Sequence, residues 1–223
     1  NLESYCFALP SYMLLPFFAI FGINLFSLKL LPLLLSLLSL IMLFYICRML
    51  FDRKVAIITT LLLALSYNFI YYTRVGLAEH DVILLFFFSG GIFLFMQYYD
   101  KKNLIFLYLA SYLFGAGLSV HLSFIARLTG IFLTILIFFR KELLNPLVKR
   151  LRVRQKLAVV MFFCLGAFFF IYYNVATKGE TFKLVRHVYY KDFAPSHLNN
   201  LNIIDSIKLR FNQLNDLVEE NPQ

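Results

Sequence analysis

Hydrophobic positions fill most of this chain in long runs separated by short polar stretches. A helix that crosses the hydrocarbon core of a bilayer needs about 20 apolar residues. Runs of about this size predict spanning helices at 30–47, 55–72, 82–99, 104–122, 124–139 and 157–177. An earlier run, 8–23, is interrupted by Pro10 and Pro16. We expect residues 10–22 to lie along the outer membrane surface rather than cross it.

The polar connections between these runs predict their orientation. Twelve Lys and Arg residues occupy every second connection, namely 48–54, 100–103 and 140–156. The alternate connections contain only three, Lys29, Arg74 and Arg127. Because loops rich in Lys and Arg stay in the cytoplasm, we expect 73–81, 122–129 and the tail from 178 to face the extracytoplasmic side.

Composition agrees with a membrane protein. Hydrophobic residues make up 61% of the chain and charged residues only 15%, against about 25% charged residues in soluble domains. The predicted fold is all-α, a polytopic transmembrane bundle of about six spans with an interfacial helix and an extracytoplasmic amphipathic tail. The expected divisions are an outer segment, 1–29, a transmembrane domain, 30–177, and the tail, 178–223. The net charge of +9 requires no nucleic acid, because cytoplasmic loops and anionic lipid explain it.

Four further observations add to this interpretation. Residues 204–218 have apolar positions at helical spacing, which indicates an amphipathic helix in the tail. Ser111, Gly115 and Ser119 recur at every fourth position, a spacing that lets another helix approach closely. The chain begins at Asn1 without Met, so we interpret it as a fragment. Its three cysteines have no metal-binding spacing, and we expect them to be inert packing residues.

The outer connection 71–81 contains the strongest candidate chemistry. Arg74, Glu79, His80 and Asp81 lie where two predicted spans meet the membrane surface. Ionisable groups at membrane depth are costly and often mark a functional site. Glu79 and Asp81 are candidate catalytic carboxylates, as acid, base or sugar ligands. A solvated loop with an internal Arg–Glu pair is the alternative.

Cations near the other outer segments are candidates for binding phosphate. Arg127 lies in an otherwise apolar run, and His121 precedes it by six positions. A guanidinium in this setting favours an anionic partner such as a lipid phosphate, although it could instead reach the headgroups. In the tail, Arg186, His187 and Lys191 lie among aromatic residues. They could bind a phosphate-linked sugar or anchor the tail at the interface.

The order of several motifs resembles that of GT-C-class membrane glycosyltransferases. These motifs include Tyr45–Lys54, Tyr72-Thr73-Arg74 with an acidic residue after it, and Phe114–Ser119 followed by a polar group. Together they are similar to protein O-mannosyltransferases and to the lipid A aminoarabinose transferase over roughly residues 10–180.

The resemblance implies a polyprenyl-phosphate sugar donor and transfer on the extracytoplasmic face. It also implies a main catalytic Asp in a loop upstream of Asn1. Glu79 best matches the acidic residue of the second outer loop, with Asp81 as the second choice, and His121 lies near a position that is Lys or His in many relatives. A family motif linked to metal is not matched at Ala8-Leu9-Pro10, so the metal is unknown and a divalent cation remains an option.

The predicted function is therefore transfer of a sugar from a polyprenyl-phosphate donor to a protein, lipid or glycan acceptor. The predicted location is a membrane, with a prokaryotic cell membrane favoured over the endoplasmic reticulum. A transporter or flippase for a lipid-linked or anionic substrate is the main alternative, and a structural membrane subunit is a third. A transporter would place polar groups along a path through the spans, whose interiors contain few charges here.

Overall fold

The computed structural model describes residues 8–75, 80–138 and 151–183. All regular elements in these ranges are α-helices. They are α1 (Leu9–Phe21), α2 (Leu25–Leu50), α3 (Arg53–Leu65), α4 (Tyr67–Val75), α5 (Asp81–Lys101), α6 (Leu104–Leu118), α7 (Phe124–Phe138), α9 (Val153–Gly166) and α10 (Phe168–Ala176). The helical fold class predicted from the sequence is therefore confirmed for the described residues.

The predicted number of about six membrane spans is not confirmed by the described residues. Among the described residues, α2 and α5 are long and apolar enough to cross a membrane by themselves. Helices α3 and α4 are bent by 55° against each other, and α9 and α10 by 69°. Counting each bent pair as one span gives up to four. Helices α1, α6 and α7 are apolar but shorter.

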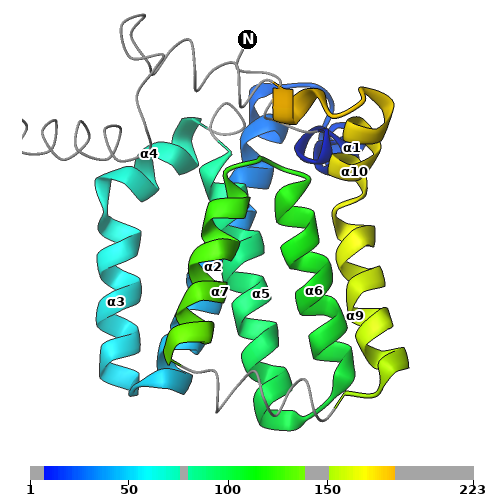
Figure 1. The fold of residues 1–223 in the computed structure, drawn as a ribbon. Coiled ribbons are helices and arrows are strands. Elements are labelled where there is room, and N and C mark those ends of the chain that lie inside the picture. Colours follow the sequence, from blue (N-terminus) through cyan, green and yellow to red (C-terminus); the bar gives the residue numbers. More distant parts are fainter. Residues whose placement is uncertain (1–7, 76–79, 139–150, 184–223) are drawn as a thin grey trace, which may run out of the picture. The chain divides into compact units, whose positions relative to one another are not determined.

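Helices α2, α5, α6 and α9 pack side by side, with α3 against α2 and α7 against α6 (Figure 1). The connection after α2, the connection after α5 and the start of α9 lie at one end of these helices, and the α6–α7 turn lies at the other. Eight of the predicted cytoplasmic cations are in described residues, and all belong to the first end: Arg48, Arg53, Lys54, Lys101, Lys102, Arg152, Arg154 and Lys156.

Side-chain caps fix where several helices begin. Asn24 accepts a hydrogen bond from the Ser27 backbone N–H at 2.8 Å, and the Ser27 hydroxyl oxygen accepts one from the Asn24 backbone N–H at 3.2 Å. This capping box starts α2 five residues before the apolar run 30–47. Asp52 caps α3 through the Val55 N–H at 2.7 Å. The caps satisfy backbone donors that have no partner inside the helix.

The bend between α3 and α4 lies at Ser66, inside the run 55–72 that was predicted as one continuous span. Ser66 has an extended backbone, with φ −67° and ψ 136°. Its hydroxyl accepts a hydrogen bond from the Phe69 N–H at 3.3 Å and donates one to the Leu63 carbonyl at 2.8 Å. Ser66 is thus the N-cap of a second helix. The run 55–72 predicted a span but not this bend, because hydrophobicity alone does not reveal a cap.

The second bend, between α9 and α10, is stabilised by Ser119, the residue that caps the C-terminus of α6. The Ser119 hydroxyl donates to the Gly166 carbonyl at 2.8 Å and accepts from the Phe170 N–H at 3.4 Å. In a continuous helix these two backbone groups would bond each other. The hydroxyl therefore replaces one helical hydrogen bond, and the predicted continuous span 157–177 is bent by this insertion.

The predicted close approach along Ser111, Gly115 and Ser119 is confirmed, and α9 is the neighbour. A Cβ atom added to Gly115 would lie 2.0 Å from the Phe163 carbonyl oxygen. A Cβ atom added to Gly166 would lie 2.1 Å from the Tyr112 carbonyl oxygen. Each glycine therefore lets the backbone of the opposite helix reach it, as in small-residue contacts between membrane helices.

A buried apolar cluster packs against the α6–α7 turn. Val120 and Phe124 are fully buried and pack with Ile83 and Leu84 of α5. The Phe124 ring lies so close to Gly117 that a Cβ atom there would be 2.4 Å from it. The turn between Leu118 and Phe124 is consequently anchored at both ends.

Helix α1 packs against α2, and its Tyr12 ring stacks on Phe169 of α10 with centroids 5.1 Å apart. Its predicted position along the membrane surface stays a prediction. Residues up to 176 belong to one compact unit and residues from 177 to a second. The predicted divisions at 29 and 177 stay predictions, and the predicted tail helix at 204–218 lies outside the described residues.

Candidate functional site

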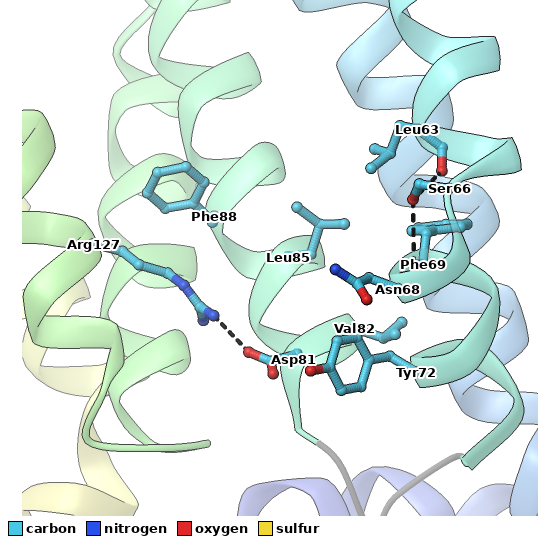
Figure 2. Close-up of a pocket in the computed structure, with 10 residues that line it drawn as sticks. All are labelled: Leu63, Ser66, Asn68, Phe69, Tyr72, Asp81, Val82, Leu85, Phe88 and Arg127. Atoms are coloured by element: carbon cyan, nitrogen blue, oxygen red, sulfur yellow. Dashed lines mark hydrogen bonds and ion pairs between the residues drawn. The ribbon is translucent and has the colours of Figure 1, made fainter. Parts of the chain in front are cut away.

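A pocket of about 590 Å³ lies between the bent pair α3–α4 and helices α5 and α7 (Figure 2). This volume is within the range of about 300–1,000 Å³ that small-molecule sites occupy. Its walls are formed by Leu63, Ser66, Asn68, Phe69, Tyr72, Asp81, Val82, Leu85, Phe88 and Arg127. The bend at Ser66 places the first turns of α4 along this pocket.

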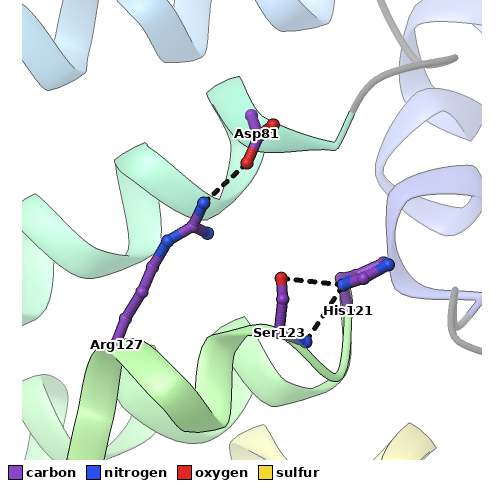
Figure 3. Close-up of polar contacts among 4 residues, drawn as sticks. All are labelled: Asp81, His121, Ser123 and Arg127. Atoms are coloured by element: carbon purple, nitrogen blue, oxygen red, sulfur yellow. Dashed lines mark hydrogen bonds and ion pairs between the residues drawn. The ribbon is translucent and has the colours of Figure 1, made fainter. Parts of the chain in front are cut away.

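An ion pair lies in the wall formed by α5 and α7. Arg127 Nη2 donates to Asp81 Oδ1 at 2.6 Å (Figure 3). Asp81 is the first residue of α5, where the helix dipole favours a negative charge. The Arg127 side chain is 34% exposed and the Asp81 side chain 43% exposed. A pair this exposed contributes only about 0–1 kcal/mol to stability, so folding stability alone gives little reason for it.

The Arg127 guanidinium retains capacity for another acceptor. Its Nη1 atom is buried and has no hydrogen-bond partner among the described residues. A buried donor without an acceptor costs about 1–3 kcal/mol. Asp81 holds one side of the group, and the other side is available for an anion such as a phosphate oxygen.

His121 lies in the α6–α7 turn, beside this ion pair. Its Nδ1 accepts hydrogen bonds from the Ser123 N–H at 3.0 Å and from the Ser123 hydroxyl at 2.8 Å (Figure 3). Nδ1 therefore carries no proton, and a neutral ring has its proton on Nε2. The His80 ring lies edge-on to it, with centroids 6.1 Å apart.

Its surroundings keep His121 neutral. Burial lowers the pKa of His121 below its ordinary value of 6.5, and His80 lowers it further. Asp81 opposes this shift and Arg127 adds to it. Near neutral pH the ring can therefore donate a hydrogen bond from Nε2 without adding a charge.

The pocket is amphipathic. Arg127 and Asp81 supply charge on one wall, while the Asn68 amide and the Tyr72 hydroxyl supply neutral polar groups from α4 (Figure 2). The remaining lining is mostly apolar: Leu63, Phe69, Val82, Leu85 and Phe88. Such a lining suits a ligand that has a polar head joined to an apolar chain.

The structure brings together two of the residues that the sequence singled out, Asp81 and Arg127, with His121 next to them. Arg74 is exposed in the last turn of α4 and is not part of the pocket wall. Glu79, Arg186, His187 and Lys191 lie outside the described residues. The roles assigned to all of these residues stay predictions.

Sequence reasoning missed Asn68 and Tyr72 as lining residues. The available signal was an amide at position 68 inside the apolar run 55–72. Within residues 8–75, 80–138 and 151–183, no group of three or more His, Cys, Asp and Glu side chains is placed to hold a metal ion.

Comparison with known proteins identifies the family. No curated protein and no solved structure matches the chain. Residues 8–173, which are most of the chain, match the model of the dolichyl-phosphate-mannose-protein mannosyltransferase family. This match agrees with the resemblance to GT-C-class enzymes and with the apolar helices. The chain therefore belongs to the dolichyl-phosphate-mannose-protein mannosyltransferase family, a class of membrane glycosyltransferases.

Proposed function

We propose that the protein transfers a sugar from a polyprenyl-phosphate donor to an acceptor on the extracytoplasmic side of a membrane. The observation that carries the proposal is the amphipathic pocket with Arg127 in its wall. A polyprenyl-phosphate sugar has the matching parts, namely an apolar chain, a phosphate and a polar sugar. The family name, with its lipid-linked sugar donor and its protein acceptor, supports the same reaction.

The positions of the charged residues support an extracytoplasmic site. Asp81 begins α5 and Arg127 is in the first turn of α7, at the end of the helices opposite to the eight described basic residues. The positive-inside rule assigns the basic end to the cytoplasm. The charged wall of the pocket would then lie toward the extracytoplasmic side. We also favour an enzyme over a flippase, because the ion pair of the site lies near helix ends rather than along the span interiors.

Each site residue has a proposed role in the transfer. The acceptor hydroxyl oxygen forms a bond to the anomeric carbon while the bond from that carbon to the phosphate oxygen breaks. Arg127 stabilises the negative charge that develops on the departing lipid phosphate. Glu79 or Asp81 takes the acceptor proton. No described residue bonds the Asp81 Oδ2 oxygen, which leaves it available for this purpose.

The other cations would assist the phosphate. His121 can donate from Nε2, on the edge of the ring that faces away from Ser123 (Figure 3). Arg74 is in the last turn of α4, two residues after the pocket residue Tyr72. Arg186, His187 and Lys191 are proposed to approach the donor from the tail. A prokaryotic cell membrane is the proposed location, and a protein, lipid or glycan hydroxyl is the proposed acceptor.

The test is sugar transfer by membrane vesicles that contain the full-length protein and radiolabelled polyprenyl-phosphate mannose. Arg127→Ala should lower the rate about 10²-fold or more, the usual effect of removing one donor to a developing anion. Glu79→Gln and Asp81→Asn separate the two candidate bases, because the loss should be about 10²-fold or more for the one that moves the proton.

Arg154→Ala is the matched control, since it removes an exposed Arg at the opposite end of the helices. It should transfer at the wild-type rate. Near-wild-type transfer by Arg127→Ala at equal expression would show that Arg127 serves anchoring alone, and the proposal would fail.

A further inference from the structure

The α4 wall of the pocket contains polar side chains that the phosphate role does not use. Asn68 and Tyr72 are four residues apart, so they lie on the same face of α4. Both line the pocket on the wall opposite Arg127 (Figure 2). The geometry points to this wall as the subsite that recognises the sugar hydroxyls of the lipid-linked donor, with Asn68 and Tyr72 as specificity-determining residues. The inference rests on the proposed function.

Asn68 has unused hydrogen-bonding capacity. Its amide forms no side-chain hydrogen bond with any residue in the described part of the chain. It projects between Leu85 of α5 and Tyr72, with Phe69 beside it. The Asn68 side chain is exposed, so its amide is open to a ligand that enters the pocket. A ligand that supplies both donors and acceptors can bond the amide NH2 group and the amide oxygen together.

The chemistry of the wall matches a sugar better than a phosphate or a lipid chain. An amide group both donates and accepts hydrogen bonds, as sugar hydroxyls do, and a phosphate needs donors only. The Tyr72 hydroxyl can also donate and accept. Neither side chain has a charge, so neither competes with Arg127 for the phosphate. In the donor the sugar is bonded directly to the phosphate, so a phosphate at Arg127 brings the sugar into the pocket that the α4 wall faces.

The position of α4 explains why these side chains reach the pocket. Ser66 caps α4 and redirects it by 55° from α3. Asn68 and Tyr72 follow this cap within the next two turns. They therefore share a wall with α5, whose residues Asp81, Leu85 and Phe88 face the same space. Tyr71, the neighbour of Tyr72, is 44% exposed and is not a lining residue.

The experiment compares binding of two ligands to the full-length protein in nanodiscs. One ligand is polyprenyl-phosphate mannose and the other is polyprenyl phosphate without sugar. Asn68→Leu keeps the size of the side chain and removes its hydrogen bonds. It should weaken binding of the mannosyl lipid about tenfold, the effect of about one net hydrogen bond, and leave binding of the bare lipid phosphate unchanged. Tyr72→Phe should act in the same direction, and Tyr71→Phe is the matched control that should change neither.

Arg127→Ala provides the contrast, because it should weaken the binding of both ligands. If Asn68→Leu and Tyr72→Phe weaken binding of both ligands equally, or weaken binding of neither, the sugar subsite is overturned while the donor function stands. Equal binding of the two lipids by the wild-type protein overturns it as well. Failure of the wild-type protein to bind either lipid instead refutes the proposed function.

Discussion

Replacing Gly115 with alanine tests whether the α6–α9 contact depends on close backbone approach. The added Cβ atom would lie 2.0 Å from the Phe163 carbonyl oxygen, and 2.9 Å from the Ala167 nitrogen. Both are backbone atoms, so no flexible side chain can move aside. Carbon atoms do not approach closer than 3.0 Å in such contacts, so α6 and α9 must separate by at least about 1 Å at this point.

The cost follows from the contacts that separation removes. A gap of about 0.5–1 Å forfeits a quarter to a half of the dispersion energy of each contact. Overpacking of this kind costs about 1–3 kcal/mol. Alanine also raises helix propensity over glycine by about 1 kcal/mol, which partly offsets the loss. Gly130→Ala in α7 measures that gain alone, because a Cβ atom at Gly130 meets nothing within 4 Å.

The assay is thermal unfolding of the purified full-length protein in detergent. The Tm of Gly115→Ala should lie below that of Gly130→Ala by about 2–12 °C, since a cost of about 1–3 kcal/mol corresponds to about 2–4 °C per kcal/mol in a protein of this size. Gly166→Ala should behave like Gly115→Ala, because its Cβ atom would lie 2.1 Å from the Tyr112 carbonyl oxygen. Equal Tm values for Gly115→Ala and Gly130→Ala would refute the reasoning.

Two further predictions concern the α6–α7 turn. Because folding lowers the pKa of His121, the unfolded chain binds a proton first as the pH falls below about 6.5, and stability should decrease there. His121→Asn keeps an acceptor for the Ser123 N–H and should show a smaller loss of Tm between about pH 7.5 and pH 5.5; an equal loss would contradict the assignment. In a background without native cysteines, Ser123→Cys and Arg154→Cys should react with an impermeant reagent from opposite sides of the membrane, whereas reaction from one side would exclude the proposed orientation.

Hydrophobic runs were sufficient to locate the helices. Each of the six predicted spans contains a helix or a bent pair in the described residues, because burial in lipid or protein demands continuous apolar sequence. Boundaries depended on polar side chains instead. Asn24 and Ser27 extend α2 beyond its apolar run. Helix α6 ends at Leu118, so His121 lies in the turn after it although the apolar run continues to 122.

The two bends could not be read from the same runs, for different reasons. Ser66 caps α4 through a local hydrogen bond, so the signal was present, but a serine is also tolerated inside an apolar helix. The bend after Gly166 depends on Ser119, a residue 47 positions earlier. No local pattern can report such a partner, because the contact exists only once α6 and α9 have packed.

The site was predictable in part for a similar reason. Asp81 and Arg127 were both assigned to outer connections, so a shared location followed from topology. Their direct contact at 2.6 Å needed the packing of α5, α6 and α7. Asn68 was overlooked because a single amide in an apolar run has no fixed direction until the bend at Ser66 orients α4.

The bend and the ion pair are two parts of one arrangement. Polar groups are least costly near helix ends, where unpaired backbone donors and the helix dipole are also found. Asp81 begins α5, Arg127 lies in the first turn of α7, and Ser66 begins α4. Because the bend at Ser66 begins a new helix, it adds a third helix N-terminus near the site.

The bend also places the α4 face with Asn68 across the pocket from Arg127. Leu63 and Phe88 keep the rest of the lining apolar. A straight helix through position 66 would lack this turn in direction, and its polar side chains would have no shared space with the ion pair.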